Sequence, residues 1–223
     1  MKLPLIIRKI KGRLIWISFR IESYLSDYWF DCFWGVETRR KLDRYDLDVE
    51  DKDLKVHAWS YEPCSYPRFK RVMKLLTVAP ANLTFVDLGS GKGKQLMAAI
   101  LNGFPKAIGV EFSPALHKAA QRNMEIFTRR VNSSTNAILE NKDATQFIIP
   151  EEACLLCLFN PFQEPVVRKF VASMTAQTAS RTESVYILYV HPTARIVFDE
   201  SPMFEMIGTM PWPTDAVLYR VLL

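Results

Sequence analysis

The sequence predicts an α/β fold built from seven strands. Between residues 80 and 223, short apolar runs that fit strands alternate with longer amphipathic runs that fit helices, as in chains of βαβ units. The last two apolar runs follow each other through the short segment 210–215, which contains two prolines. This arrangement predicts a terminal hairpin with one antiparallel strand.

The expected strands are 83–88, 107–111, 137–140, 154–159, 184–191, 204–209 and 216–223. The expected helices are 66–78, 93–103, 114–129 and 164–178. The helix at 114–129, for example, places its apolar residues on one face at helical spacing. The chain is 223 residues long and 49% hydrophobic, which suffices for one core and an appended segment. We therefore expect an N-terminal extension at 1–79 and an α/β domain at 80–223.

A glycine-rich loop joins the first expected strand to the helix that follows it. Residues 85–94 read FVDLGSGKGK, with glycines at 89, 91 and 93. Glycines allow positive φ and close approach of a ligand, and the free N–H groups of a helix start suit polar or anionic ligand atoms. The loop therefore predicts a pocket for a nucleotide-type cofactor, although a tight βα turn without a ligand is the plain alternative.

The glycine spacing narrows the choice of cofactor. A dinucleotide fingerprint needs G-x-G-x-x-G, and a P-loop would need glycine at 88 and Ser or Thr at 95, where Leu88 and Gln95 stand. The sequence D-L-G-S-G-K-G instead resembles motif I of the class I S-adenosylmethionine-dependent methyltransferases. This resemblance implies a Rossmann-like, seven-stranded, mostly parallel sheet with helices on both faces and an antiparallel C-terminal hairpin. It also implies that S-adenosyl-L-methionine is the cofactor, held by Asp87, Gly89, Ser90, Gly91 and Gly93.

Two further strand ends carry candidate cofactor contacts. Glu111 ends the second strand, 20 residues after Gly91, where a carboxylate can bind ribose hydroxyls. The resemblance places Phe112 near the adenine and gives Asp143 and Ala144, after the third strand, a similar role. Glu111 could also be a surface residue at a strand end, and Asp143 could be the N-cap of a short helix.

The fourth strand runs into Asn160, Pro161 and Phe162, which resemble motif IV of amino-group methyltransferases with one residue missing. An amine nucleophile must be neutral, desolvated and oriented. The Asn160 oxygen can accept its N–H bonds, Pro161 stiffens the turn, and the Phe162 ring favours a cationic product. An ordinary Asn-Pro turn is the simpler interpretation.

The first 20 residues carry six Lys and Arg and no acid. They therefore hold a charge of +6 against +5 for the whole chain, so the remainder sums to −1. A broadly basic nucleic-acid surface is therefore not expected. Interleaved apolar residues predict a basic amphipathic helix for peripheral membrane or partner contact, unless the segment packs on the domain or stays disordered. Charges interrupt the apolar run too often for a membrane span, and no cleavage site marks a signal peptide.

Other side chains point less clearly to function. Cys154 and Cys157 are three apart in an expected strand, so they face opposite ways and no metal site is predicted. His191, at the end of the fifth strand, could assist proton removal, and a structural role is the simpler interpretation. Tyr61, Glu62 and Tyr66 precede the domain, where they could line the site or pack on the sheet edge. Free thiols and the lack of a secretory signal favour the cytoplasm, including its membrane face.

The resemblance thus implies an enzyme that transfers a methyl group from S-adenosylmethionine to an amine. The strand-end layout and the segment Asn160-Pro161-Phe162 also resemble protein-lysine methyltransferases outside the SET fold, which makes a protein lysine side chain the first candidate acceptor. An acceptor in RNA or a small molecule is one alternative. A non-catalytic adaptor that docks through its N-terminal leader is another. The oligomeric state stays open.

Overall fold

The computed structural model describes residues 5–43, 48, 60–131, 136–159, 161–178 and 181–223, with only the backbone described for 5–10. The α-helices are α1 (Leu5–Trp34), α3 (Tyr66–Val72), α4 (Lys94–Leu101), α5 (Pro114–Val131), α6 (Glu164–Thr178) and α7 (Ile196–Asp199). The strands are β1 (Thr84–Leu88), β2 (Lys106–Glu111), β3 (Asn136–Asn141), β4 (Cys154–Leu158), β5 (Val185–Val190), β6 (Phe204–Met210) and β7 (Ala216–Val221).

The seven strands form one sheet in the order β3-β2-β1-β4-β5-β7-β6. Strands β1 to β5 are mutually parallel, while β7 runs antiparallel to both β5 and β6. The predicted seven-stranded α/β fold with its antiparallel C-terminal hairpin is therefore confirmed. Since β1 lies between β2 and β4, the loops after these three strands meet at one edge of the sheet.

Each face of the sheet buries its own apolar core. One core packs strand residues such as Val86 against α6 and α7. The other packs residues such as Phe85 against α3, α4, α5 and Phe30 of α1. Alternate residues of a strand point to opposite faces, so a strand buried on both sides is apolar throughout, as β4 is. Helices therefore cover both faces, as expected.

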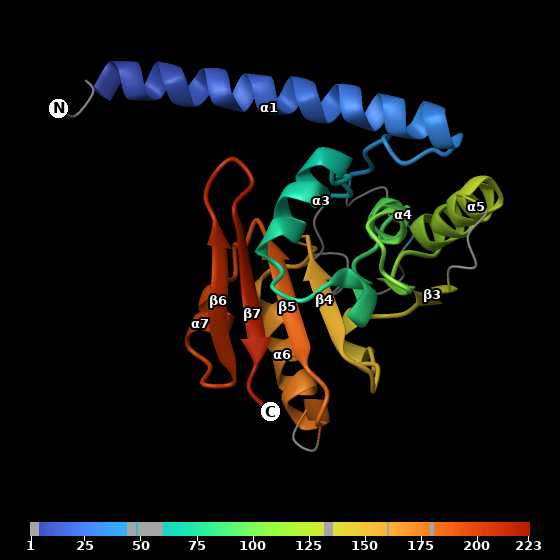
Figure 1. Ribbon diagram of the computed structural model, residues 1–223, viewed down its shortest axis with the longest axis vertical. Coiled ribbons are helices and arrows are strands. Elements are labelled where there is room, and N and C mark those ends of the chain that lie inside the picture. Colours follow the sequence, from blue (N-terminus) through green and yellow to red (C-terminus); the bar gives the residue numbers. More distant parts are fainter. Residues whose placement is uncertain (1–4, 44–47, 49–59, 132–135, 160, 179–180) are drawn as a thin grey trace.

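The largest differences from the predicted helix boundaries are at α3 and α1. The expected helix at 66–78 ends as α3 at Val72 and continues only as a 3-10 turn, Met73–Leu75, because the chain then becomes extended at Leu76. Helix α1 continues well past residue 20, to Trp34. Figure 1 shows α1 lying across the end of the molecule toward which β4 and β5 point. The division of the chain at residue 79 remains a prediction.

Candidate functional site

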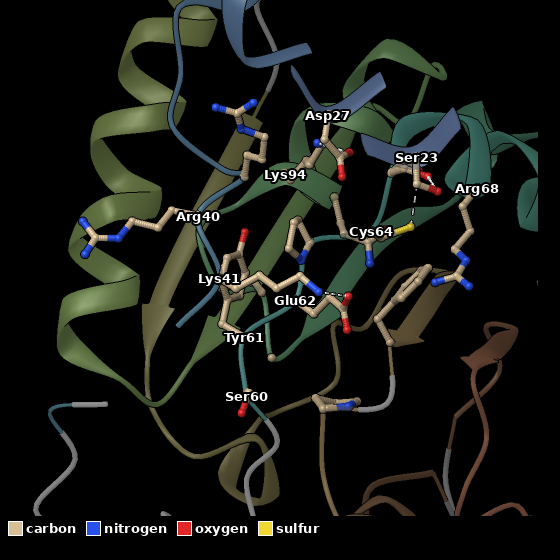
Figure 2. Close-up of a pocket in the computed structure, with 18 of the residues that line it drawn as sticks. Ser23, Asp27, Arg40, Lys41, Ser60, Tyr61, Glu62, Cys64, Arg68 and Lys94 are labelled. Atoms are coloured by element: carbon tan, nitrogen blue, oxygen red, sulfur yellow. Dashed lines mark hydrogen bonds and ion pairs between the residues drawn. The ribbon is translucent and has the colours of Figure 1, made fainter. Parts of the chain in front are cut away.

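A cavity of about 1230 Å³ lies at the carboxyl edge of the sheet. Its walls come from the loops after β1, β2, β4 and β5, from the β6–β7 turn, and from α1 with the segment 60–65. Figure 2 shows how side chains from α1, such as Asp27, and from the segment 60–65, such as Tyr61, line the same space. The volume exceeds that of most small-ligand sites, so it suits a nucleotide-sized molecule together with a second reactant.

The glycine loop approaches its neighbours closely where a side chain would not fit. Gly89 has φ +86°, and a Cβ there would lie 2.5 Å from Pro161 Cβ. Gly91 has φ +53°, and a Cβ there would lie 2.2 Å from the Tyr61 ring. Gly93 lies away from the cavity wall and serves as the left-handed N-cap of α4. Bare backbone is thus needed beside Pro161 and under Tyr61.

Asp87, at the end of β1, is a buried acid that lines the cavity. Its side chain is only 1% exposed, and neither carboxyl oxygen has a hydrogen-bond partner among the described residues. Burial, and then the charge of Glu111, raise the pKa of Asp87 well above its usual value. Ser90 Oγ and Gln95 Oε1 in the same wall are likewise buried without a partner among those residues. Such groups are costly unless a ligand satisfies them.

Glu111, at the end of β2, also lines the cavity and is held by the backbone. Gly91 N donates to Glu111 Oε2 at 2.8 Å, and Ser113 N donates to Oε1 at 2.9 Å. Burial raises the pKa of Glu111 to about 7, although these two N–H groups oppose the shift. The second acid is therefore fixed in place next to the glycine loop, and each of its oxygens can accept a further bond. Phe112 follows it in the cavity wall.

Helix α1 is joined to the glycine loop by buried charges. Lys94, the first residue of α4, forms an ion pair with Asp27 of α1 at 2.5 Å, and both are buried. Burial raises the pKa of Asp27, and the Lys94 charge opposes that shift. Lys92 forms a second pair at 2.5 Å with Glu37, just after α1. These contacts were not predicted from the sequence. The sequence shows the charged residues themselves, Asp27 and the two lysines that alternate with the glycines, but it carries no signal that pairs them.

The segment before the domain also reaches the glycine loop. The Tyr61 ring covers Gly91, and its hydroxyl donates to Thr38 O at 2.8 Å. Glu62 pairs with Lys41 at the cavity wall, as Figure 2 shows. Tyr66 instead packs against Phe30 of α1. Of the two tyrosines considered from the sequence, Tyr61 lines the cavity and Tyr66 belongs to the core.

The far side of the cavity is aromatic and basic. It is lined by Phe159, Pro161, Phe162, Arg68, His191, Trp212 and Pro213. Arg68 Nη2 donates to Pro213 O at 3.2 Å. His191 adopts φ 50°, a conformation that few residues other than glycine take up. Burial, and then the Arg68 charge, lower the pKa of His191. Asn160 lies outside the described residues.

The cavity brings together most of the predicted site residues. Its wall contains Asp87, Gly89, Ser90, Glu111, Phe112, Pro161 and Phe162, and Gly91 lies just behind Tyr61. Asp143 and Ala144 do not line it. Asp143 accepts from Thr145 N at 2.9 Å and caps the short 3-10 helix Ala144–Gln146. Asp143 is thus occupied by the capping role that its residue type also suggested.

Cys154 and Cys157 point into different cores, as their spacing predicts. Among the residues that the structure describes, no cluster of three or more His, Cys, Asp or Glu could hold a metal ion.

The residues present fit S-adenosylmethionine. The cofactor offers an ammonium group, two ribose hydroxyls and an adenine ring. The cavity offers the unpartnered Asp87 carboxyl, the fixed Glu111 carboxyl and bare glycine backbone. Charge-assisted bonds to a cation and to hydroxyls are what two such acids can supply.

Comparison with known proteins supports the fold. No family model matches the chain, and neither does any curated protein sequence. Among solved structures, yhhF of Escherichia coli, a provisionally assigned methyltransferase, is 11% identical with a TM-score of 0.54 over 70% of this chain and 86% of its own. The provisionally assigned methylase HI0767 of Haemophilus influenzae is 16% identical with a TM-score of 0.52, over 70% of this chain and 100% of its own.

An RNA methyltransferase from Salinibacter ruber, solved with S-adenosyl-L-homocysteine, is 20% identical with a TM-score of 0.49 over 71% of this chain and 92% of its own. Similarity at these sequence identities is evidence for a shared fold and not for a shared function. Together with the strand order, the first two structures show that this chain shares their seven-stranded, Rossmann-like fold.

Proposed function

We propose that the protein binds S-adenosylmethionine in this cavity and transfers its methyl group to an amine nitrogen. The observation that carries the proposal is the pair of buried acids, Asp87 and Glu111, on either side of a glycine loop whose backbone is bare. Such a pair costs stability in the free protein. A ligand with a cationic group and vicinal hydroxyls offsets that cost.

Each cofactor residue has a distinct task in this proposal. Glu111 would accept hydrogen bonds from the ribose hydroxyls, and Asp87 would neutralise the ammonium group. Gly89 and Gly91 would let the cofactor chain lie directly on the backbone. The bound cofactor supplies a methyl group on a cationic sulfur, which a neutral nucleophile attacks in line.

The other side of the cavity favours an amine as that nucleophile. The positive charge of Arg68, which shares the cavity wall with the aromatic rings of Phe159 and Phe162, disfavours an ammonium ion and so favours the neutral, nucleophilic amine. The aromatic faces also attract the methylated cation that forms. A neutral His191, favoured by its lowered pKa, can accept the proton that the nitrogen loses. A lysine side chain of a protein has the length and chemistry to enter such a site.

Two measurements test the proposal in sequence. Calorimetry with S-adenosylmethionine should show binding to the wild-type protein, and its absence would end the proposal. Incubation with cofactor labelled in the methyl group should then transfer label to the protein fraction of a lysate. Label in RNA or small metabolites instead would reject the lysine assignment but keep the enzyme. Binding without transfer to any fraction would favour a non-catalytic adaptor.

Cofactor affinity should increase with pH. Because burial raises the pKa of Glu111 to about 7, the free protein holds a proton there at lower pH. Hydroxyl groups donate to the ionised form, so binding must release that proton. We expect affinity to rise about tenfold between about pH 6 and about pH 8. Calorimetry in buffers of different ionisation enthalpy measures the released proton directly.

The variant Glu111→Gln is the control for this pH dependence. It keeps the shape of the side chain and cannot titrate, so its affinity should be lower and should rise less steeply with pH over the same range. Asp87 accounts for the remaining slope, because its pKa is also raised and it too must lose its proton to pair with the ammonium group. A slope in Glu111→Gln as steep as that of the wild type would show that Glu111 does not contribute to the pH dependence.

A further inference from the structure

Helix α1 exposes a long apolar stripe on the side that faces away from the domain. The stripe, here called the outer face, consists of Leu14, Ile17, Ile21, Leu25, Tyr28 and Trp29, all of which are exposed. The spacing is that of one helix face. On the opposite side of the same helix, Asp27 and Phe30 are buried against the domain. The helix therefore carries apolar residues on both sides, one side packed on the domain and the other exposed.

The exposure of the outer face is large for a surface helix. Leu14 is 61% exposed and Trp29 68%, and Phe33 beside them is 71% exposed. Scattered exposed apolar residues are normal, but a continuous patch of this length marks an interaction surface. Figure 1 shows α1 extending beyond the sheet domain at its N-terminal end, with no other described element over its far side.

Positive charge lies beside part of the outer face. Lys11 and Arg13 are exposed near its N-terminal end, whereas Arg20 and Arg40 are exposed but line the cavity. The Arg39 guanidinium lies over the Tyr28 ring at 5.1 Å and over the Tyr24 ring at 5.7 Å. In sequence, the first 20 residues have a net charge of +6.

The acids of α1 do not offset that charge on the outer face. Glu22 pairs with Arg71 at 2.5 Å and Asp27 pairs with Lys94 at the same distance. Asp31 accepts from Thr38 N and Arg39 N, each at 2.9 Å. Each acid is thus used within the domain, which leaves the described outer side of α1 apolar and basic.

We propose that the outer face of α1 binds the surface of a membrane that contains anionic lipids. A helix with apolar and aromatic residues flanked by Lys and Arg lies in the plane of the interface, with its apolar side among the acyl chains. Charge decides against a second copy of the chain as the occupant, because pairing two outer faces would bring like charges together. In the part of the chain that the structure describes, no helix is long and apolar enough to cross a membrane.

Vesicle sedimentation with the full chain tests this proposal. The wild type should pellet with vesicles of phosphatidylcholine that contain phosphatidylglycerol, and much less with phosphatidylcholine alone. The double variant Leu25→Ser, Trp29→Ser should bind at least about tenfold more weakly, because it removes two large apolar groups from the interface. The double variant Lys11→Gln, Arg13→Gln should lose affinity for the anionic vesicles only, as should the wild type at high salt.

The matched control is the double variant Ile148→Ser, Ile196→Ser, which removes two apolar residues that are equally accessible but lie away from α1. It should bind vesicles like the wild type. Failure of the wild type to pellet with anionic vesicles overturns the proposal. So does binding that the outer-face variant leaves unchanged. Sedimentation velocity tests whether a second copy of the chain occupies the outer face. If the wild type does not bind vesicles, and is a dimer that becomes monomeric in the Leu25→Ser, Trp29→Ser variant, the outer face serves self-association. All variants should keep wild-type helicity and melting temperature, since the changed side chains are exposed.

Discussion

Replacing Asp87 by asparagine is expected to raise the melting temperature of the free protein and, at the same time, to weaken binding of S-adenosylmethionine. The carboxyl group is buried without a hydrogen-bond partner in the described structure, and its pKa is raised. The folded state therefore holds a proton that the unfolded state releases, so stability falls as pH rises above the ordinary Asp value. The Asp87→Asn variant would remove that penalty, and the gain should grow between about pH 5 and about pH 8.

Binding should change in the opposite direction because asparagine cannot neutralise the ammonium group of the cofactor. The loss of one charge-assisted bond predicts an affinity about ten to one hundred times lower, measured by calorimetry. The control is Asp143→Asn, since Asp143 caps a short helix away from the cavity and asparagine caps equally well. Neither stability nor binding should change there. Wild-type affinity in Asp87→Asn would show that Asp87 does not contact the cofactor.

Replacing Asp27 by alanine should produce the largest loss of stability. The variant leaves Lys94 buried and unpaired beside the glycine loop, where its side chain is 3% exposed. Removing one partner of a buried ion pair costs about 3–5 kcal/mol, and for a protein of this size that lowers the melting temperature by about 6–20 °C. Urea denaturation and calorimetry measure both quantities.

Two variants show whether the unpaired lysine is the cause. Glu22→Ala breaks a half-exposed ion pair on the same helix, so it should cost no more than about 1 kcal/mol. Adding Lys94→Met to Asp27→Ala removes the unpaired charge and should restore most of the stability. A double variant as unstable as Asp27→Ala alone would assign the loss to packing of α1 and not to the ion pair.

The fold could be predicted from the sequence because most strands are short apolar runs and the segments between them have the composition of loops or helices. Each strand of the sheet is a short apolar run that ends in a loop of distinctive composition. The clearest is the run from Phe85 through Gly93. Boundaries were less accurate. The helix expected at 66–78 stops at Val72, because the turn toward Pro80 is set by tertiary packing and not by periodicity.

The meeting of Asp87 and Glu111 in one cavity was also predictable, since the carboxyl ends of parallel strands meet at one edge of the sheet. Asp87 and Glu111 end neighbouring strands and line one cavity. The role of α1 was not readable. Periodicity places Asp27 on one side of a helix, but it does not reveal that a lysine 67 positions later lies against it. Contacts between distant elements depend on the docking of whole helices, which a single sequence does not encode locally.

The contact between α1 and the glycine loop has a thermodynamic consequence for two distant ligands. Asp27 on the inner side of the helix pairs with Lys94, and Glu37 just after the helix pairs with Lys92, so a displacement of α1 changes the glycine loop of the proposed cofactor site. Linkage is reciprocal. Whatever factor a ligand on the outside of α1 imposes on cofactor affinity, the cofactor must impose on the affinity of that ligand. Through this one helix, binding of a cofactor in the cavity and binding of a ligand to the outer face of α1 become thermodynamically coupled.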